Sequence, residues 1–336
     1  MLVSDFSYAL PEELIAQEPL AQRDGSRLLV VDRARETIEH RKFFEIVDYL
    51  RDDDLMVFND TRVVATRLVG AKQTGGKVEA LMMKRLGPGV WEAMVKPGRR
   101  VAVGCKLIFD RGLTADVVDR TPEGGRILRL VADSDPDELV AATGQVPLPP
   151  YVHKRLEDPE RYQTVYAAAD GSAAAPTAGL HFTPALLGAI RSRGIKMAFV
   201  TLHVGIATFR PVRTQRVEDH EMHVEHYEIS EAGAQLINAA RGRIVCVGTT
   251  TARALESAAV GKRRVAAGAG ATGLFIRPSY NFQIVEALLT NFHMPKSTLL
   301  ILVSALAGNA LVRRAYEEAV RARYRFLSFG DVMFIC

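Results

Sequence analysis

The chain has 336 residues, with a hydrophobic fraction of 48% and a charged fraction of 24%, as in a soluble globular protein of about two domains. Its net charge of +4 permits a polyanionic partner without requiring one, and its three widely separated cysteines exclude a disulfide framework or a thiolate zinc site. The longest apolar run, 299–307, falls far short of the roughly 20 residues that span a bilayer, and no basic export signal opens the chain, so we expect a cytoplasmic protein without a membrane span.

The first part of the chain predicts a buried strand and then a β-rich insertion. The apolar run 55–58 is followed by four polar residues: Asn59, Asp60, Thr61 and Arg62. Ligands of α/β sheets bind at such strand ends, although a simple turn would also use these residues. Between 63 and 146, turns with glycine and proline separate four β-rich runs: 77–83, 91–95, 101–109 and 126–131. We expect residues 63–146 to form a small antiparallel β-barrel domain.

The second part of the chain predicts alternating strands and helices. The helix signals are a Thr183-Pro184 start with a Gly194 stop, a start at Ser230, and a Ser297 start with a Gly308 stop. The expected elements are helix 185–193, strand 195–204, helix 230–242, strand 243–247, helix 249–255, helix 298–307 and helix 309–323, and the chain finishes with an apolar run, 332–335. This alternation indicates an open α/β main domain made of residues 1–62 and 147–336.

One familiar pattern does not carry its usual meaning. Residues 268–273 match G-x-G-x-x-G, which binds dinucleotides only where a strand ends and a helix begins. Here the pattern is followed by Leu274, Phe275 and Ile276, which are strand-like, and then by Pro278. We therefore expect no dinucleotide site.

A histidine cluster raises the question of a metal. His220, His223 and His226 lie three residues apart, among three carboxylates. On a helix the three histidine side chains would be spread over about 120° of its circumference. On a strand, two histidines three residues apart would point to opposite faces. In either case one metal ion could bind two of the histidines but not all three. We expect no metal site. A metal-dependent hydrolase that uses these histidines is kept as an alternative function.

Three short segments are candidates for ligand binding. A turn at Gly248 begins a helix with Thr249, Thr250 and Thr251, whose backbone N–H groups suit a carboxylate or a phosphate, although capping alone explains these threonines equally well. His181 and His203 each lie among small residues at the edge of a regular element. A lone histidine in such a place is more often structural than catalytic.

Ordered matches along the whole chain resemble a known family. They lie at 59–63 (NDTRV), 147–151 (PLPPY), 161–167 (RYQTVYA), 175–182 (APTAGLHF), 201–205 (TLHVG), 208–212 (TFRPV), 220–223 (HEMH), 248–250 (GTT), 290–293 (TNFH), 295–300 (PKSTLL), 324–326 (YRF) and 330–331 (GD). In these segments the chain is similar to the S-adenosylmethionine:tRNA ribosyltransferase-isomerase family of queuosine biosynthesis.

The resemblance implies an α/β domain with an inserted β-barrel and a defined reaction. The ribosyl part of S-adenosylmethionine is transferred to 7-aminomethyl-7-deazaguanine at the tRNA wobble position and isomerised, which gives epoxyqueuosine and releases adenine and methionine. S-adenosylmethionine is then a co-substrate, and no permanent cofactor is expected. The expected partners are this tRNA and S-adenosylmethionine, and the expected state is a monomer.

The same resemblance, combined with the residue chemistry, gives candidate site residues. For proton transfer we expect His181 and His203 first, followed by His223, Glu225 and Asp331. For the methionine carboxylate we expect Thr249, Thr250 and Arg253, and for tRNA phosphates Arg62 and Arg210, with the basic series Arg321, Arg323 and Arg325 also facing tRNA. Further substrate contacts are expected from Asn59, Asp60, Thr61, Thr177, Gly179, Asn291 and His293.

Three positions depart from the family pattern. Ala207 and Ser279 stand where glycine is expected, and Phe329 stands where tyrosine is expected. The first two restrict close backbone approach and the third removes a hydroxyl.

From another functional class, a non-catalytic RNA-binding module is the remaining alternative, and it predicts affinity for RNA without consumption of S-adenosylmethionine.

Overall fold

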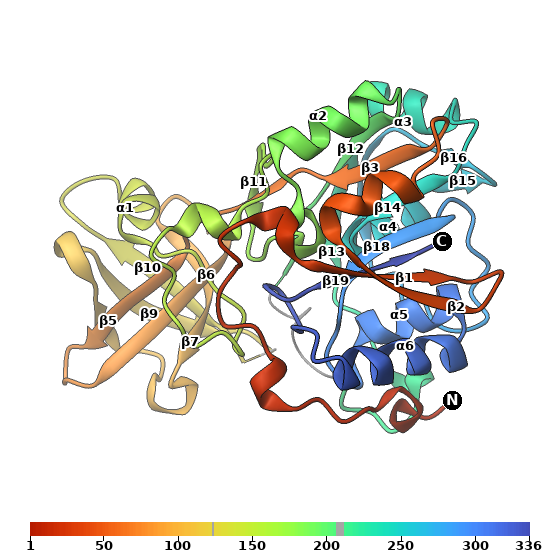
Figure 1. Cartoon of the computed structure of the whole chain (residues 1–336). Coiled ribbons are helices and arrows are strands. Elements are labelled where there is room, and N and C mark those ends of the chain that lie inside the picture. Colours follow the sequence, from red (N-terminus) through yellow and green to blue (C-terminus); the bar gives the residue numbers. More distant parts are fainter. Residues whose placement is uncertain (123, 206–211) are drawn as a thin grey trace. The chain divides into compact units, whose positions relative to one another are not determined.

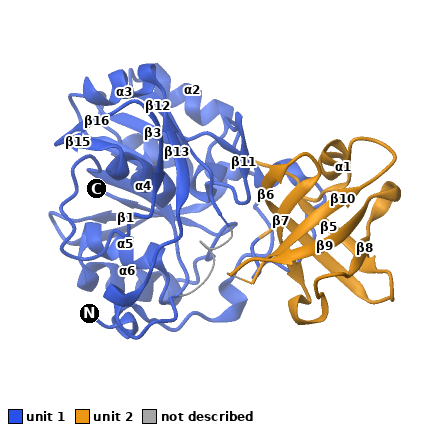
Figure 2. Ribbon diagram, turned by 180° about the vertical axis from the view of Figure 1, so that it is seen from behind, with its two compact units in different colours: residues 1–62, 149–336 blue, residues 63–148 orange. Residues whose placement is uncertain are grey.

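The computed structural model describes residues 1–122, 124–205 and 212–336. The chain divides into two compact units, residues 1–62 with 149–336 and residues 63–148 (Figure 2). Each unit buries hydrophobic residues of its own. We call the first the α/β unit and the second the barrel unit.

A nine-stranded sheet forms the centre of the α/β unit, in the order β17-β13-β12-β3-β14-β18-β19-β1-β2 (Figure 1). Its strands are β1 (Arg27–Asp32), β2 (Thr37–Lys42), β3 (Leu55–Asn59), β12 (Lys196–Leu202), β13 (Glu225–Ile229), β14 (Ile244–Val247), β17 (Gly268–Thr272), β18 (Ala287–Asn291) and β19 (Val332–Ile335). Strands β12, β3, β14 and β18 are mutually parallel, whereas β19 is antiparallel to β18. The expected open α/β fold is confirmed, with antiparallel strands added at both edges.

Helices cover both faces of this sheet. They are α2 (Pro184–Ser192), α3 (Glu231–Asn238), α4 (Thr249–Ser257), α5 (Thr298–Ala307) and α6 (Asn309–Arg321), with the 3-10 helices η4 (Phe43–Tyr49) and η8 (Thr177–His181). Because side chains alternate along a strand, Leu55 and Val57 pack with α3 to α6, and Met56 and Phe58 pack with α2 and η4. Both faces are buried, as parallel strands require.

The helix ends follow the signals in the sequence. The hydroxyls of Thr183, Ser230 and Ser297 accept hydrogen bonds from backbone N–H groups in the first turns of α2, α3 and α5. Gly308 ends α5 with a φ of 84°, which favours glycine. No single described helix is long and apolar enough to cross a membrane. The pair α5 and α6 passes only when taken together across a 117° bend.

The glycine-rich segment 268–273 differs in detail from the expectation. The strand is Gly268–Thr272 itself, and residues 274–276, expected to be strand-like, are not in a strand. Strand β17 pairs along its whole length with β13 and opens no helix. The pattern therefore lacks the strand-to-helix turn of a dinucleotide site.

The barrel unit is a closed barrel with the order β10-β7-β6-β5-β8-β9. Its elements are β5 (Arg67–Lys72), β6 (Lys77–Gly87), β7 (Val90–Lys96), β8 (Lys106–Ile108), β9 (Thr114–Arg120), β10 (Arg126–Val131) and helix α1 (Pro136–Thr143). Of the expected run 101–109 only Lys106–Ile108 is a strand, and residues 103–104 form a turn. Buried Arg126 donates hydrogen bonds to Gly98 O and Val101 O beside it. Two small two-stranded sheets complete the chain, β4 (Thr61–Val63) with β11 (Ala169–Ser172) and β15 (Ala259–Gly261) with β16 (Arg264–Val265).

Candidate active site

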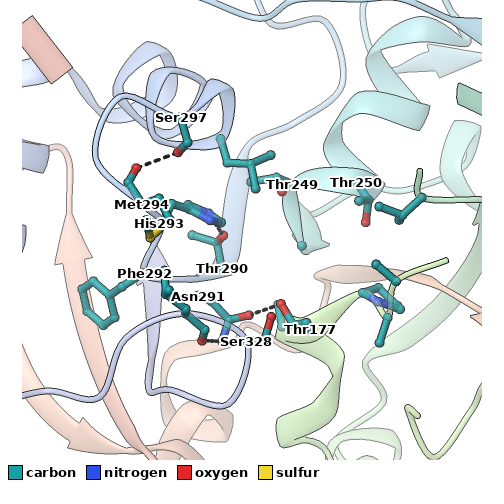
Figure 3. A pocket seen from close by; sticks show the side chains of 18 of the residues that line it. Thr177, Thr249, Thr250, Thr290, Asn291, Phe292, His293, Met294, Ser297 and Ser328 are labelled. Atoms are coloured by element: carbon teal, nitrogen blue, oxygen red, sulfur yellow. Dashed lines mark hydrogen bonds between the residues drawn. The ribbon is translucent and has the colours of Figure 1, made fainter. Parts of the chain in front are cut away.

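A cavity of about 800 Å³, including open solvent at its mouth, lies in the α/β unit at the carboxyl ends of parallel strands. Its lining comes from the turn after β14, from the end of β18 and the segment that follows it, and from η8 (Figure 3). The polar lining residues are Tyr151, Thr177, Thr249, Thr250, Thr290, Asn291, His293, Ser297 and Ser328. This is where open α/β sheets bind ligands.

The N-terminus of α4 forms one wall of this cavity. Gly248 precedes the helix with a φ of 93°, and Thr249 and Thr250 begin it. Thr250 Oγ1 accepts a hydrogen bond from Asn59 Nδ2 at 3.3 Å, whereas no described residue hydrogen-bonds the hydroxyl of Thr249, a residue only 5% exposed. The free backbone N–H groups and the positive end of the helix dipole make this wall suitable for an anion.

Helix α5 brings a second N-terminus to the cavity. Ser297 lines it, donates a hydrogen bond to Met294 O at 2.8 Å and accepts one from Leu300 N at 3.2 Å. On another part of the wall, Tyr151 Oη and Ser328 Oγ lie 2.7 Å apart. Tyr151, Thr290 and Ser297 lie in segments that resemble the family, but the sequence did not assign them to the site and did not single out Ser328. Their common location depends on segments up to 177 residues apart.

Asn291, at the end of β18, connects the cavity to a buried histidine. Its Oδ1 accepts from Thr177 Oγ1 at 2.8 Å, and its Nδ2 lies 3.3 Å from His181 Nε2. The other ring nitrogen of His181, Nδ1, lies 2.8 Å from Ser26 Oγ. Burial lowers the pKa of His181 to about 3, so its imidazole is neutral at pH 7. His181 does not line the main cavity, whereas Thr177 and Asn291 do.

His293 is a second buried histidine, and it lines the cavity directly. Its Nε2 lies 2.8 Å from Thr290 Oγ1, and its backbone N–H donates to Tyr316 Oη at 3.0 Å. Burial alone lowers its pKa to about 3. His293, which we expected to contact the substrate, therefore lines the cavity as a neutral imidazole ring.

The polar residues after β3 gather around His203. Asn59 is fully hydrogen-bonded, since its Oδ1 accepts from the N–H groups of Thr61 and Leu202. Thr61 Oγ1 lies 2.8 Å from His203 Nδ1, and Asp60 accepts from Thr201 Oγ1 at 2.7 Å. The half-buried His203 has its pKa lowered by burial, with nearby Asp60 acting in the opposite direction, and burial raises the pKa of Asp60. His203 does not line the cavity itself, whereas Val204, the next residue along the chain, does.

Glu225 and Arg253 form a buried ion pair instead of facing the cavity. Each is about 5% exposed, and Glu225 also accepts from Gly205 N at 3.0 Å. Arg253 Nε donates to Leu274 O at 3.2 Å. Neither side chain lines the cavity. Arg253, which we expected to bind the methionine carboxylate, is therefore not part of the wall that Thr249 and Thr250 form.

Three other expected residues have structural contacts. The buried carboxylate of Asp331 accepts from the backbone N–H groups of Arg27 and Arg325, both at 2.8 Å. Gly179 leaves room for Tyr166, because a Cβ there would lie 2.0 Å from its hydroxyl. Arg62 pairs with Glu160 on the surface.

The remaining expected residues lie elsewhere. His223 is exposed, and Arg210 lies outside the described residues. The ring of His220 packs edge-on against that of Phe275, with 5.4 Å between the ring centroids. Within the described ranges, no group of three or more His, Cys, Asp or Glu side chains could hold a metal ion, so the hydrolase alternative has no supporting geometry.

Comparisons with known proteins agree with this fold. A family model described as queuosine biosynthesis protein matches residues 3–335. Two relatives named S-adenosylmethionine:tRNA ribosyltransferase-isomerase, from Acetivibrio thermocellus and Symbiobacterium thermophilum, are 50% and 53% identical over the full length of both chains. A crystal structure of S-adenosylmethionine tRNA ribosyltransferase from Thermotoga maritima is 39% identical, with a TM-score of 0.57 over 99% of this chain and 100% of that one. The resemblance seen in the motifs is confirmed, and the chain belongs to the queuosine biosynthesis protein family.

Proposed function

We propose that the chain is an S-adenosylmethionine:tRNA ribosyltransferase-isomerase. It transfers and isomerises the ribosyl part of S-adenosylmethionine onto 7-aminomethyl-7-deazaguanine at the tRNA wobble position, which gives epoxyqueuosine and releases adenine and methionine. The observation that carries the proposal is the match over the whole length to relatives of that name, at 50% and 53% identity. A non-catalytic RNA-binding module would not need the cavity at the strand ends.

The reaction requires a base and a dry, oriented pocket. The sulfonium acidifies the C5′ protons of the ribose, so removal of one gives an ylide that expels adenine. The aminomethyl nitrogen of the tRNA base then attacks the ribosyl fragment, and methionine departs. Because the cavity lies between helix N-termini and apolar side chains, it can hold the methionine half away from water.

Among the histidines, His203 is our proposed base. It is half-buried, follows strand β12 and adjoins Val204 in the cavity wall. By contrast, Nε2 of His181 already faces Asn291, and this residue is only 6% exposed. For the methionine carboxylate we assign Thr249, Thr250 and the N-terminus of α4, without Arg253.

For tRNA we propose contacts through cations that no acidic group neutralises. Arg321 pairs with Glu318, and Arg323 lies 3.8 Å from Glu13. These two arginines are therefore less available to bind tRNA phosphates. On the barrel unit, Arg99 and Arg100 are exposed and form none of the ion pairs described, and buried Arg126 holds their turn through Gly98 O and Val101 O. Such side chains suit phosphates.

Product analysis tests the proposed activity. With S-adenosylmethionine and tRNA carrying 7-aminomethyl-7-deazaguanine, adenine and methionine should appear in equal amounts, because the ribosyl fragment must lose both neighbours. The matched control, tRNA without that base, should give neither product. Formation of S-adenosylhomocysteine would identify a methyltransferase and overturn the proposal.

We further propose a cytoplasmic monomer without a permanent cofactor. The three free cysteines are separate, and the histidine cluster lacks the geometry of a metal site among the described residues. Metal analysis of the purified protein should find no stoichiometric zinc, and a chelator should leave turnover unchanged. Sedimentation should give the mass of one chain.

A further inference from the structure

The orientation of the Asn291 amide is fixed by its backbone neighbours. Nδ2 lies 3.3 Å from Leu327 O and 3.5 Å from Asp331 O. Carbonyl oxygens only accept hydrogen bonds, so the NH₂ group must face them and Oδ1 must face the other way. Reversal of the amide would place its oxygen against two carbonyl oxygens.

This orientation determines the polarity of Thr177. Asn291 Oδ1 only accepts, and it lies 2.8 Å from Thr177 Oγ1, so the threonine hydroxyl donates its single proton to it. Only lone pairs of Thr177 Oγ1 are then left for the cavity that this residue lines (Figure 3). In the cavity the hydroxyl is an acceptor and not a donor.

His181 holds the chain of hydrogen bonds in this direction. Because Nδ2 of Asn291 donates, His181 Nε2 must accept, and the ring proton is on Nδ1, which donates to Ser26 Oγ. The lowered pKa of His181, due to burial, is consistent with a neutral ring. A protonated Nε2 would face an amide NH₂ group, which excludes the reversed polarity.

Hydrogen-bond donors lie beside Thr177 in the cavity wall. The N-terminus of α4 presents N–H donors to the same cavity, together with the hydroxyl of Thr249, which no described residue hydrogen-bonds. The two walls adjoin, since a Cβ at Gly248 would lie 3.9 Å from that of Ala178, the residue after Thr177. An acceptor next to a set of donors matches the ammonium and carboxylate groups of an α-amino acid, which share one carbon.

We infer that Thr177 is the specificity-determining acceptor for the ammonium group of S-adenosylmethionine, with the carboxylate at the N-terminus of α4. This inference rests on the proposed function. Asn291 and His181 are positioning residues, which act on the ligand only through Thr177. Its hydroxyl selects ligands that carry a donor at this point and disfavours analogues with an acceptor there.

Calorimetric titration with matched ligands tests the assignment. Thr177→Val removes the acceptor with little change of shape and should raise the Kd for S-adenosylmethionine about tenfold or more, as expected for a lost hydrogen bond to a charged group. The Kd for the analogue without the α-amino group should not change. Thr177→Ser should restore most of the affinity, and the exposed-strand variant Thr37→Val is the matched control.

Two further measurements extend the test, and the second does not depend on the stability of Thr177→Val. The decarboxylated analogue, which keeps its amino group, should lose affinity on Thr177→Val but not on Thr249→Val. Nitrogen NMR of labelled histidine should find His181 with an unprotonated Nε2. Equal losses for both analogues, or a protonated Nε2, would overturn the inference alone, whereas failure of the unaltered protein to bind S-adenosylmethionine would overturn the proposed function as well.

Discussion

The two units differ most in the polar groups that they bury. In the described barrel unit the buried polar side chains are Thr66 and Arg126, whereas the α/β unit buries more than twenty, among them Asn59, His181, Asn291 and Asp331. All residues that line the cavity belong to the α/β unit. Since a buried polar group is costly unless it is hydrogen-bonded, this concentration marks the unit that has a ligand site to build.

Backbone strain follows the same division. The described barrel turns place six glycines and one other residue, Arg111, at positive φ. In the α/β unit six non-glycine residues do so, and two of them, Lys296 and Leu327, adjoin or line the cavity. Such conformations persist where surrounding contacts impose them, which is common at functional sites. Positive φ thus falls mostly on glycines in the barrel unit and more often on other residues in the α/β unit.

The largest expected effect is on catalysis. His203→Ala should lower turnover about 10²- to 10⁴-fold with modest change in substrate binding, because it removes the proposed proton acceptor. His153→Ala, at an exposed histidine, is the matched control. Full turnover by His203→Ala would leave the site in the α/β unit but refute this choice of base.

The pH dependence of the same reaction sharpens the assignment. Burial lowers the pKa of His203, so the base loses activity only when pH falls below that lowered value. The acidic limb of kcat/KM should therefore have its midpoint below the ordinary histidine value of about 6.5. A midpoint above it would point to a different group.

Acid should destabilise the two units unequally. The folded-state pKa values of His181 and His293 are about 3, below the unfolded value, so their stabilising contribution is complete above about pH 6.5 and is lost as pH falls toward 3. As pH falls through that window, each of these histidines lowers the free energy of unfolding by about 1.4 kcal/mol per pH unit. Residues 63–148 contain no histidine.

Two optical probes separate these transitions. The only tryptophan, Trp91, is in the barrel unit and bonds to Asp137 at 2.6 Å, whereas most helices are in the α/β unit. On acidification the helical circular dichroism should change at higher pH than the tryptophan fluorescence. Coincident changes would show that the units unfold together and that the difference in histidine content has no separate effect.

A smaller effect is expected on tRNA affinity. Arg99→Ala with Arg100→Ala should weaken binding and reduce the salt slope by about 0.7 to 0.9 per lost contact, because fewer counterions are released. The matched control, Arg321→Ala with Arg323→Ala, should change it less, since Glu318 and Glu13 lie beside these arginines. The reverse order in filter-binding titrations would assign RNA contact to the α/β unit.

The smallest effect concerns strain away from the cavity. Ser279 has a φ of 77° in an exposed turn, at a position where the family pattern predicts glycine. Ser279→Gly relieves that strain but gives the unfolded chain more freedom, so we expect a gain of no more than about 1 kcal/mol in chemical denaturation. The converse change, Gly104→Ser at a φ of 86°, should destabilise the barrel unit by a similar amount.

Much of the fold could be predicted from local signals. The start of α2 at Thr183-Pro184 and both ends of α5 are confirmed, because caps and stops act within one helical turn. Strands β5 and β9 were not predicted, since half-exposed barrel strands lack a continuous apolar run. Motif resemblance found Thr177, Asn291 and His181, but not the direction of the hydrogen bonds between them. That direction depends on Leu327 O and Asp331 O, which are at least 36 residues away along the chain.

The position of β19 has a consequence for how the protein is made. Strand β1, near residue 30, pairs with Val332–Ile335, and β19 separates β1 from β18. About 300 residues must therefore leave the ribosome before the first strand can join the sheet. Until then the hairpin of β1 and β2 exposes one unpaired edge, which is open to chaperones and to wrong partners. The barrel unit, whose strands pair within residues 67–131, can close long before that.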